Sequence, residues 1–222
     1  MSTLESVVVE TAAVTTKSVI WLHGLGADGH DFEPVVPQLG LERAPGIRFV
    51  FPHAPVRPVT INNGMAMRAW FDILALDRTG PKDEAGIAQS VAAVESLIAV
   101  EMEAGRSAAD IVLAGFSQGG VIALHAALRY PVRLAGVLAL STYLPMHDEL
   151  TADASTANRD LPVFLAHGRM DPVLTFDLGE HVRDVLQAAG YPLEWHEYAM
   201  AHQVCMEELR DVGAWLGRVL SD

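Results

Sequence analysis

The chain has 222 residues, half of them apolar, and its 15 Lys and Arg against 28 Asp and Glu give a net charge of −13. This length fits one domain with a single large core. A strongly negative protein repels phosphate backbones and anionic lipid headgroups. The composition therefore argues against nucleic-acid binding and against polybasic attachment to membranes.

The start of the chain and its cysteine content indicate a cellular compartment. The first residues contain no basic segment, and Glu5 interrupts the apolar run, so we expect no signal peptide. The longest apolar stretches, around Val91–Val100 and Leu134–Leu144, are interrupted by polar residues and fall short of the roughly 18 residues of a membrane span. Cys205 is the sole cysteine, which excludes an intrachain disulfide and fits a reducing compartment. We expect a cytoplasmic protein without stable membrane anchoring, folded as one domain over residues 1–222.

Short apolar runs alternate with longer helical patterns along the chain. Five runs are continuous and rich in Val, Leu and Ile, as in buried parallel strands: Val19–Leu22, Ile47–Phe51, Ile111–Ala114, Ala135–Leu140 and Pro162–Ala166. The segment Leu193–Tyr198 alternates, which is typical of an edge strand. Helical patterns cover Asp83–Ala104, Gln118–Arg129, Phe176–Ala189 and Gln203–Leu220. The alternation predicts an α/β fold, with a mostly parallel central sheet and helices on both faces.

A G-x-S-x-G motif lies between a predicted strand and a predicted helix. Ser117 is its central residue, with Gly115 and Gly119 two positions away on either side. In the nucleophile elbow of α/β hydrolases, a strained strand-to-helix turn holds the serine above the sheet, and small neighbours let the chain pass closely. The alternative is a glycine-rich turn with an idle serine. The flanking strand and helix favour the nucleophile.

A serine hydroxyl needs a base to take its proton, and the base needs a third group to orient it. In this type of fold the acid and then the histidine follow the serine along the chain. Asp171 follows the strand that ends at Ala166, and His202 follows the strand that ends at Tyr198. The carboxyl ends of parallel strands meet at one edge of a sheet, so we expect the three side chains to converge there.

Each partner also has a plainer interpretation. Asp171 precedes a proline, and an aspartate followed by proline is a good helix N-cap. His202 is one of nine histidines, four of which also lie near predicted strand ends: His23, His53, His167 and His196. Only the order along the chain and the position after a strand distinguish His202 from these.

The oxyanion formed by serine attack on a carbonyl needs backbone N–H donors. Gln118, the residue after the nucleophile, should supply one from a helix N-terminus. The glycine-rich loop that begins at His23 follows the first buried strand, and its Leu25 N–H is the candidate second donor. The same loop contains G-x-G-x-x-G over Gly24–Gly29, but no acidic residue ends the next strand, so dinucleotide binding is not favoured.

The long segment Val56–Lys82 fits neither strand nor helix and carries many apolar side chains, which is typical of a functional loop. We expect Trp70 and Leu74 to help wall the acyl side of the site, although both could equally be core residues. Val173, two residues after Asp171, is a further candidate for substrate binding. No metal-ligand motif stands out, and we expect neither a metal nor a cofactor.

With these residues in view, the chain resembles the carboxylesterase/acyl-protein thioesterase family, the lysophospholipase-like α/β hydrolases. The resemblance spans nearly the whole chain in order: Leu22–Gly26, Pro52–Pro55, Trp70–Asp72, Gly115–Gly120, His167 through Val173, and Tyr198 through His202. It implies an α/β-hydrolase domain, the triad Ser117, Asp171 and His202, and the donors Leu25 and Gln118. It also implies hydrolysis of small-molecule esters or acyl thioesters without a cofactor, and a possible homodimer.

The expected activity is ester or thioester hydrolysis through an acyl-serine, with short to medium acyl chains. Several alternatives stay open at this point. The family includes protein-depalmitoylating thioesterases, and the same fold hosts dienelactone hydrolases and perhydrolases. A binding protein that has lost catalysis is the alternative from outside the enzymes. The residues Arg169 and Met170 before Asp171 depart from the polar pairs that are common in the family.

Overall fold

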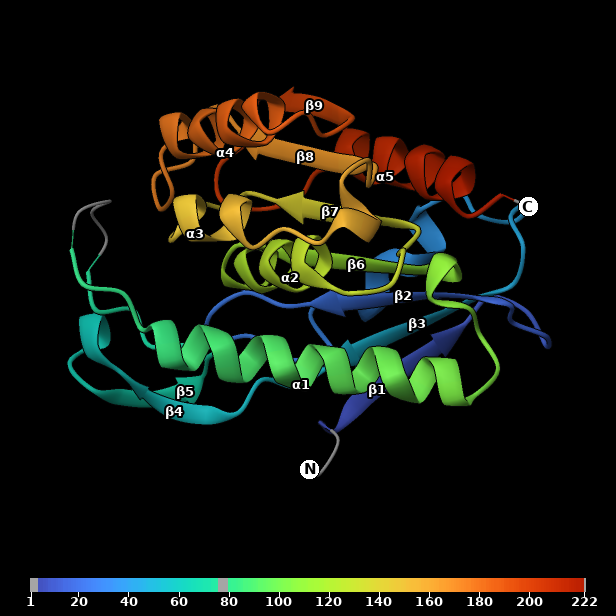
Figure 1. Cartoon of the computed structure of the whole chain (residues 1–222), viewed down its shortest axis with the longest axis horizontal. Coiled ribbons are helices and arrows are strands. Elements are labelled where there is room, and N and C mark those ends of the chain that lie inside the picture. Colours follow the sequence, from blue (N-terminus) through green and yellow to red (C-terminus); the bar gives the residue numbers. More distant parts are fainter. Residues whose placement is uncertain (1–3, 76–79, 222) are drawn as a thin grey trace.

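The computed structural model describes residues 4–75 and 80–221. They form a seven-stranded sheet of order β1-β3-β2-β6-β7-β8-β9, in which β1 is antiparallel to β3 and the other neighbours are parallel (Figure 1). The strands are β1 Ser6–Glu10, β2 Lys17–Leu22, β3 Ile47–Pro52, β6 Ile111–Phe116, β7 Gly136–Leu140, β8 Val163–Gly168 and β9 Leu193–Tyr198. The predicted mostly parallel sheet is confirmed, and β9 forms one edge as its alternating pattern indicates.

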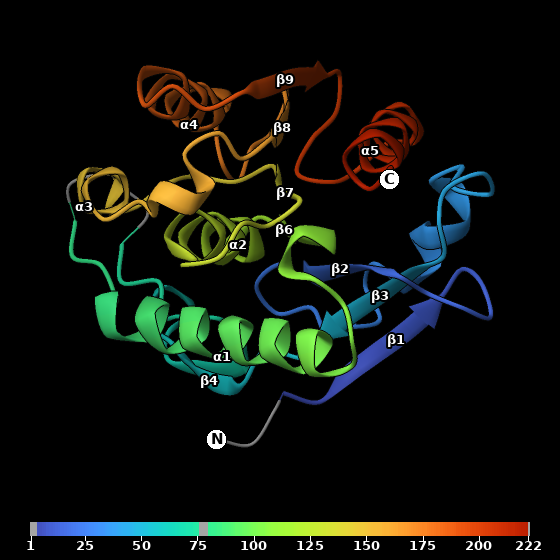
Figure 2. The same cartoon turned by 45° about the vertical axis from the view of Figure 1, so that its right-hand side comes forward.

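Helices cover both faces of this sheet, which was also predicted. Figure 2 shows α1, α2 and α4 on one side and α5 on the other. The short α3 lies on the α2 side, and a 3₁₀ helix lies on the α5 side. The bounds are Glu84–Glu103 for α1, Gln118–Arg129 for α2, His147–Ala152 for α3, Phe176–Ala188 for α4, Met206–Val219 for α5 and Glu33–Gln38 for the 3₁₀ helix.

The core consists of two apolar layers, one on each face of the sheet. Successive side chains of a strand point to opposite faces, so each buried strand contributes to both layers. In β2, Ile20 and Leu22 pack beneath α1 and α2, whereas Val19 and Trp21 pack beneath α5. This is why the parallel strands have continuous apolar sequences rather than alternating ones.

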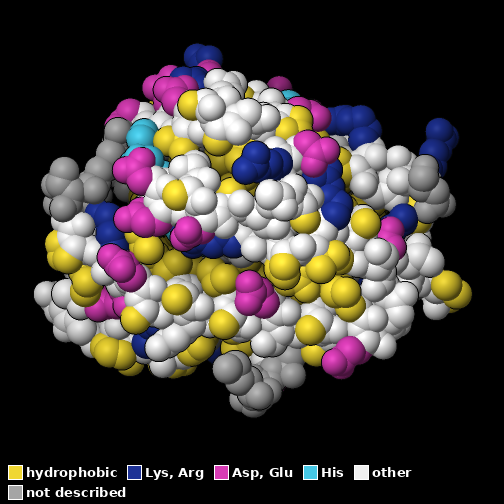
Figure 3. All heavy atoms as spheres, viewed as in Figure 1, with side chains coloured by type: hydrophobic (Ala, Val, Ile, Leu, Met, Phe, Trp, Pro, Cys, Tyr) yellow, Lys and Arg dark blue, Asp and Glu magenta, His cyan; other side chains and the backbone are white. Residues whose placement is uncertain are grey.

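Helix α1 is long and apolar enough to cross a membrane by length and composition, although 44% of its most apolar window is buried inside the protein. Ile87, Val94 and Ile98 form its buried stripe against the core. Hydrophobic side chains are also visible along α1 on the surface in Figure 3. The buried Glu101 near the end of α1 forms ion pairs with Arg48 and Arg106.

Three differences from the sequence prediction lie at the edges of the fold. Strand β1 was not predicted, and helix α5 begins at Met206 rather than Gln203. The segment Val56–Lys82 contains a hairpin of β4 (Val56–Val59) and β5 (Met65–Arg68). Pro58 argues against a central strand, but it is tolerated in this two-stranded hairpin.

The hairpin lies close to the loop that follows β2. The Gly26 N–H donates to the Arg68 carbonyl at 2.9 Å. This bond places the rest of the segment, Ala69 to Ala75, beside the carboxyl end of the sheet.

Candidate active site

Ser117 lies in a sharp turn between β6 and α2. Its backbone has φ 54° and ψ −119°, a strained conformation for a residue with a side chain. The turn is closed tightly, because a Cβ on Gly115 would overlap the backbone of Gly119, and a Cβ on Gly119 would overlap the Leu22 carbonyl. The Ser117 N–H donates to the Leu140 carbonyl at 2.9 Å, which fixes the turn against β7.

The structure brings the three predicted catalytic side chains together. His202 Nε2 lies 3.0 Å from Ser117 Oγ, and His202 Nδ1 lies 2.6 Å from Asp171 Oδ2. A carboxylate accepts a hydrogen bond, so the Nδ1 atom carries the hydrogen and Nε2 is free to accept the serine proton. The Asp171 side chain is fully buried and that of His202 is 16% exposed. This is the arrangement of a nucleophile, a base and an orienting acid.

Asp171 is held by a turn rather than by a helix. Its Oδ1 accepts the backbone N–H groups of Val173 and Leu174 at 2.8 and 2.9 Å, which leaves Oδ2 for His202. Helix α4 begins later, at Phe176, so the helix N-cap interpretation of Asp171 is wrong. The proline after Asp171 starts this turn instead.

Backbone hydrogen bonds join the loop that carries the acid to the loop that carries the base. They follow β8 and β9, which are neighbouring strands. Arg169 N–H donates to the Tyr198 carbonyl and Met170 N–H donates to the Met200 carbonyl. Gly168 permits this approach, because a Cβ there would overlap the Met200 carbonyl. The distance between acid and base is thus fixed by backbone bonds.

The two candidate oxyanion donors lie on neighbouring strands. Leu25 follows β2 and Gln118 follows β6, and these strands pair with Leu22 opposite Gly115. In the described part of the chain, neither backbone N–H has a hydrogen-bond partner. Both residues line the same cavity as Ser117 and His202. Two unused donors beside a nucleophile are what an oxyanion hole requires.

An apolar cavity of about 260 Å³ opens beside the serine. Of the predicted substrate-binding residues, Val173 lines it, but Trp70 and Leu74 do not. Trp70 is completely buried, and Leu74 lines a separate small cavity of about 10 Å³. The expectation that these two residues wall the acyl site is therefore wrong. Their neighbours in the same segment, Ile73 and Ala75, contact the cavity instead.

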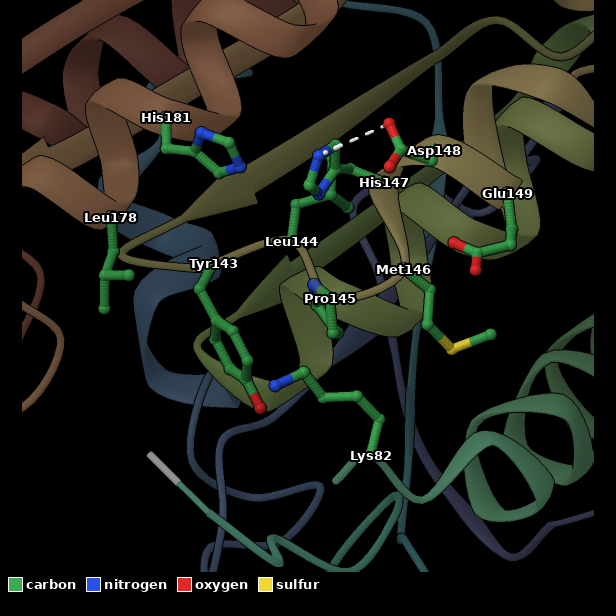
Figure 4. A pocket seen from close by; sticks show the side chains of 10 residues that line it. All are labelled: Lys82, Tyr143, Leu144, Pro145, Met146, His147, Asp148, Glu149, Leu178 and His181. Atoms are coloured by element: carbon green, nitrogen blue, oxygen red, sulfur yellow. Dashed lines mark ion pairs between the residues drawn. The ribbon is translucent and has the colours of Figure 1, made fainter. Parts of the chain in front are cut away.

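A second cavity of about 190 Å³ lies beside the first (Figure 4). Figure 4 shows it between α3, α4 and Lys82, with the His147 and Asp148 side chains paired at 3.5 Å on its rim. Tyr143 borders both cavities. Its partly buried position raises the pKa of its hydroxyl, which therefore stays protonated.

Sequence reasoning did not find all of the residues that shape the site. Ile61, Tyr143 and Leu174 also line the catalytic cavity. Their sequence positions carry no signal, since each is an ordinary apolar or aromatic residue outside the predicted strands and helices. Over residues 4–75 and 80–221, no group of three or more His, Cys, Asp or Glu side chains is arranged to hold a metal.

Comparison with known proteins agrees with this geometry. The family model described as "Phospholipase/Carboxylesterase" matches residues 4–220. The chain belongs to this family. It is 38% identical over 222 residues to acyl-protein thioesterase 1 of Cryptococcus neoformans, covering 92% of this chain and 93% of that protein. Membership of the phospholipase/carboxylesterase family identifies the chain as a serine hydrolase of esters or thioesters.

Solved structures place this phospholipase/carboxylesterase family member among α/β hydrolases. Arabidopsis thaliana SOBER1 superposes with a TM-score of 0.86 at 31% identity, over 92% of this chain and 99% of that one. Zea mays acyl-protein thioesterase 2 superposes with a TM-score of 0.85 at 30% identity, over 98% and 99% of the two chains. The predicted α/β-hydrolase fold is confirmed.

Proposed function

We propose that the enzyme hydrolyses small-molecule esters and acyl thioesters by acyl transfer to Ser117. One observation carries the proposal: a single imidazole, that of His202, lies within hydrogen-bond distance of both Ser117 Oγ and the buried carboxylate of Asp171. A serine that bonds an oriented neutral imidazole is activated as a nucleophile.

The geometry assigns a role to each group. His202 Nε2 takes the proton of Ser117 as Oγ bonds to the substrate carbonyl carbon, and the oxyanion is stabilised by the N–H groups of Leu25 and Gln118. When the carbonyl reforms, the bond to the leaving alcohol or thiol breaks and His202 gives that group the proton. Water then repeats the sequence, its proton passing to His202 and then to Ser117 as the acid leaves.

The cavity favours acyl groups of short to medium length. Its volume is about 260 Å³, and Ile61, Ile73 and Val173 give it mainly apolar walls. Each methylene of an acyl chain that leaves water for such walls contributes about 0.8 kcal/mol. Chain preference should therefore increase with length until the cavity is filled, and then fall.

Active-site labelling tests the proposal. A fluorophosphonate should label Ser117 of the wild-type enzyme and leave Ser117→Ala unlabelled and inactive toward p-nitrophenyl esters. Mass spectrometry of a short incubation with a slow ester should detect the acyl group on the peptide that contains Ser117. Labelling at another serine, or full activity of Ser117→Ala, would contradict it.

A second candidate substrate is an S-acylated protein. The observation in its favour is the similarity to proteins named acyl-protein thioesterases at 38% identity. Hydrolysis of an S-octanoyl cysteine peptide should be compared with that of an octanoyl ester of a small alcohol. A much higher kcat/KM for the peptide would favour protein substrates, and the reverse would favour small molecules.

The acidic composition and the single cysteine support a cytoplasmic enzyme without stable membrane anchoring. We also propose a homodimer, as the resemblance to the family implies. Fractionation of cells that produce the protein tests the compartment. Sedimentation at micromolar concentration tests the dimer, and a single monomeric species would exclude it.

A further inference from the structure

Two residues outside the triad connect the two halves of the oxyanion hole. The candidate donors Leu25 and Gln118 belong to different loops and lie about ninety residues apart in the chain. An oxyanion hole works only if its donors are already in place when charge develops. The contacts that set their relative position are therefore part of the catalytic machinery.

The ring of His23 has a defined tautomer. Its Nε2 accepts the N–H of Ala54 at 3.0 Å, so that nitrogen carries no hydrogen. The hydrogen of the neutral ring is then on Nδ1, which donates to the Gly24 carbonyl at 2.7 Å. Burial lowers the pKa of His23, which keeps the ring in this neutral form.

The hydrogen bond from the His23 ring fixes the orientation of the peptide group between Gly24 and Leu25. The Gly24 carbonyl and the Leu25 N–H belong to one planar trans peptide, so they point in opposite directions. With the carbonyl fixed toward the His23 ring, the Leu25 N–H must point away from that ring. Gly24 and Leu25 both line the catalytic cavity. The buried imidazole thus aims the first donor.

Trp70 links this loop to the second donor. Its indole Nε1–H donates to the His23 carbonyl at 2.9 Å, and its backbone N–H donates to Gln118 Oε1 at 2.7 Å. Gln118 Nε2 in turn donates to the Phe71 carbonyl at 2.7 Å. Trp70 is completely buried and its ring lies 5.3 Å from that of His23. Trp70 therefore donates a hydrogen bond to His23 through its side chain and another to Gln118 through its backbone, and so connects the two loops that carry the oxyanion donors.

We propose that Trp70 sets the spacing of the two oxyanion donors and that His23 sets the direction of the Leu25 N–H, both as positioning residues. The inference rests on the proposed function, in that Leu25 and Gln118 are the donors. It also gives Trp70 a role different from the acyl wall expected from the sequence.

The first test removes the indole N–H together with part of the ring. Trp70→Phe keeps an aromatic ring but loses the bond to the His23 carbonyl. Loss of a whole oxyanion donor costs about 10²- to 10³-fold in kcat, so a displaced donor should cost about 10- to 100-fold, with KM within about threefold. The inhibition constant of an octyl trifluoromethyl ketone, which forms an oxyanion on the serine, should weaken by the same factor.

Trp21 supplies a matched control. It is another buried tryptophan, in β2, and its indole nitrogen has no hydrogen-bond partner among the described residues. Trp21→Phe therefore changes ring size without removing a bond. Its kcat and its affinity for the ketone should stay within about threefold of wild type. If Trp70→Phe behaves as Trp21→Phe does, or raises KM alone, the inference is wrong.

A second pair of variants tests the role of His23 independently of whether Trp70→Phe folds. His23→Asn keeps an N–H donor close to the position of Nδ1, whereas His23→Leu has none. The asparagine variant should retain affinity for the ketone within about tenfold and the leucine variant should lose about 100-fold. Equal losses would overturn the role of His23. A wild-type enzyme that fluorophosphonate does not label at Ser117 would instead overturn the proposed function itself.

Discussion

The ring of His167 donates its Nε2 hydrogen to the carbonyl oxygen of Leu174 at 2.8 Å, and this bond closes the loop that presents Asp171. Burial lowers the pKa of His167, so the ring stays neutral beside the Asp171 carboxylate 3.5 Å away. A charged ring would compete with His202 for that carboxylate. The loop is thus fixed by a histidine that takes no proton from the substrate.

Helix α4 packs closely on this ring, which gives the first prediction. A Cβ on Gly179 would overlap the His167 ring. Gly179→Ala should therefore displace the loop, lower the stability by about 1–3 kcal/mol and reduce kcat. Urea denaturation and esterase kinetics measure the two effects.

The control for Gly179→Ala is Gly217→Ala. A Cβ on Gly217, in α5, meets no atom within 4 Å. Alanine there should stabilise the helix by about 0.5–1 kcal/mol and leave kcat unchanged. Equal stability of the two variants would show that the contact with His167 is unimportant.

The second prediction separates the two oxygens of Asp171. In Asp171→Asn, the side-chain oxygen can still accept the N–H groups of Val173 and Leu174, while the amide NH₂ faces His202 Nδ1. That contact favours the wrong tautomer of His202, so kcat should fall by about 10⁴-fold, as in the serine proteases. The melting temperature should change little because the turn is kept.

Asp28→Asn is the matched control for this substitution. Asp28 lies in the loop after β2, and its Oδ1 accepts the N–H of His30, outside the triad. Activity within about twofold of wild type is expected. A similar kcat for the two variants would contradict the role of Asp171.

The third prediction concerns Glu208, a buried carboxyl in the first turn of α5. The residue is completely buried, and burial raises its pKa to about 8. The folded protein therefore holds this proton more tightly than the unfolded chain. The contribution to stability is complete below the unfolded value near 4.5 and is lost as the pH rises toward 8.

Stability should consequently fall between pH 5 and 8 by as much as about 1.4 kcal/mol per pH unit, and Glu208→Gln should remove this slope. Its exposed neighbour Glu207 provides the control, since Glu207→Gln makes the same change of charge without burial. Urea midpoints at three pH values measure the slope. An unchanged slope in Glu208→Gln would mean that another group is responsible.

The fourth prediction concerns acyl-chain length. Ala75 lines the catalytic cavity, and Ala75→Leu should fill part of its volume. If three methylenes of an octanoyl chain lose burial at about 0.8 kcal/mol each, the ratio of kcat/KM for octanoyl over acetyl esters should fall about 10- to 100-fold. Leu74→Ala, next in the chain but facing the separate small cavity, should leave the ratio within about twofold.

Much of the fold and the triad could be predicted because both depend on local patterns. Buried parallel strands need continuous apolar runs, and the elbow needs small residues around Ser117. Asp171 and His202 could be found because the order of the elements places them after neighbouring strands. The edge strand β1 was missed, since an isolated Ser6–Glu10 pattern has little to distinguish it from a tail.

The walls of the site could not be predicted in the same way. Trp70, Ile73 and Leu74 lie within five residues of one another, and only the backbone path decides which of them meets the cavity. That path depends on the bonds from Gln118 to Trp70 and Phe71, which join segments almost fifty residues apart. The sequence pattern contains no information on such long-range hydrogen bonds. Trp70, the largest apolar side chain of the segment, was therefore expected to line the acyl site.

The elbow has a consequence for laboratory evolution of this enzyme. Side chains on Gly115, Gly119 or Gly120 would overlap neighbouring atoms that belong to three different strand ends and turns. Nearly every member of a random library with a substitution at these positions should be inactive toward all esters alike. Libraries intended to change substrate range should therefore keep these three codons constant and vary Ile61, Ile73 and other wall positions, where a new side chain meets open space.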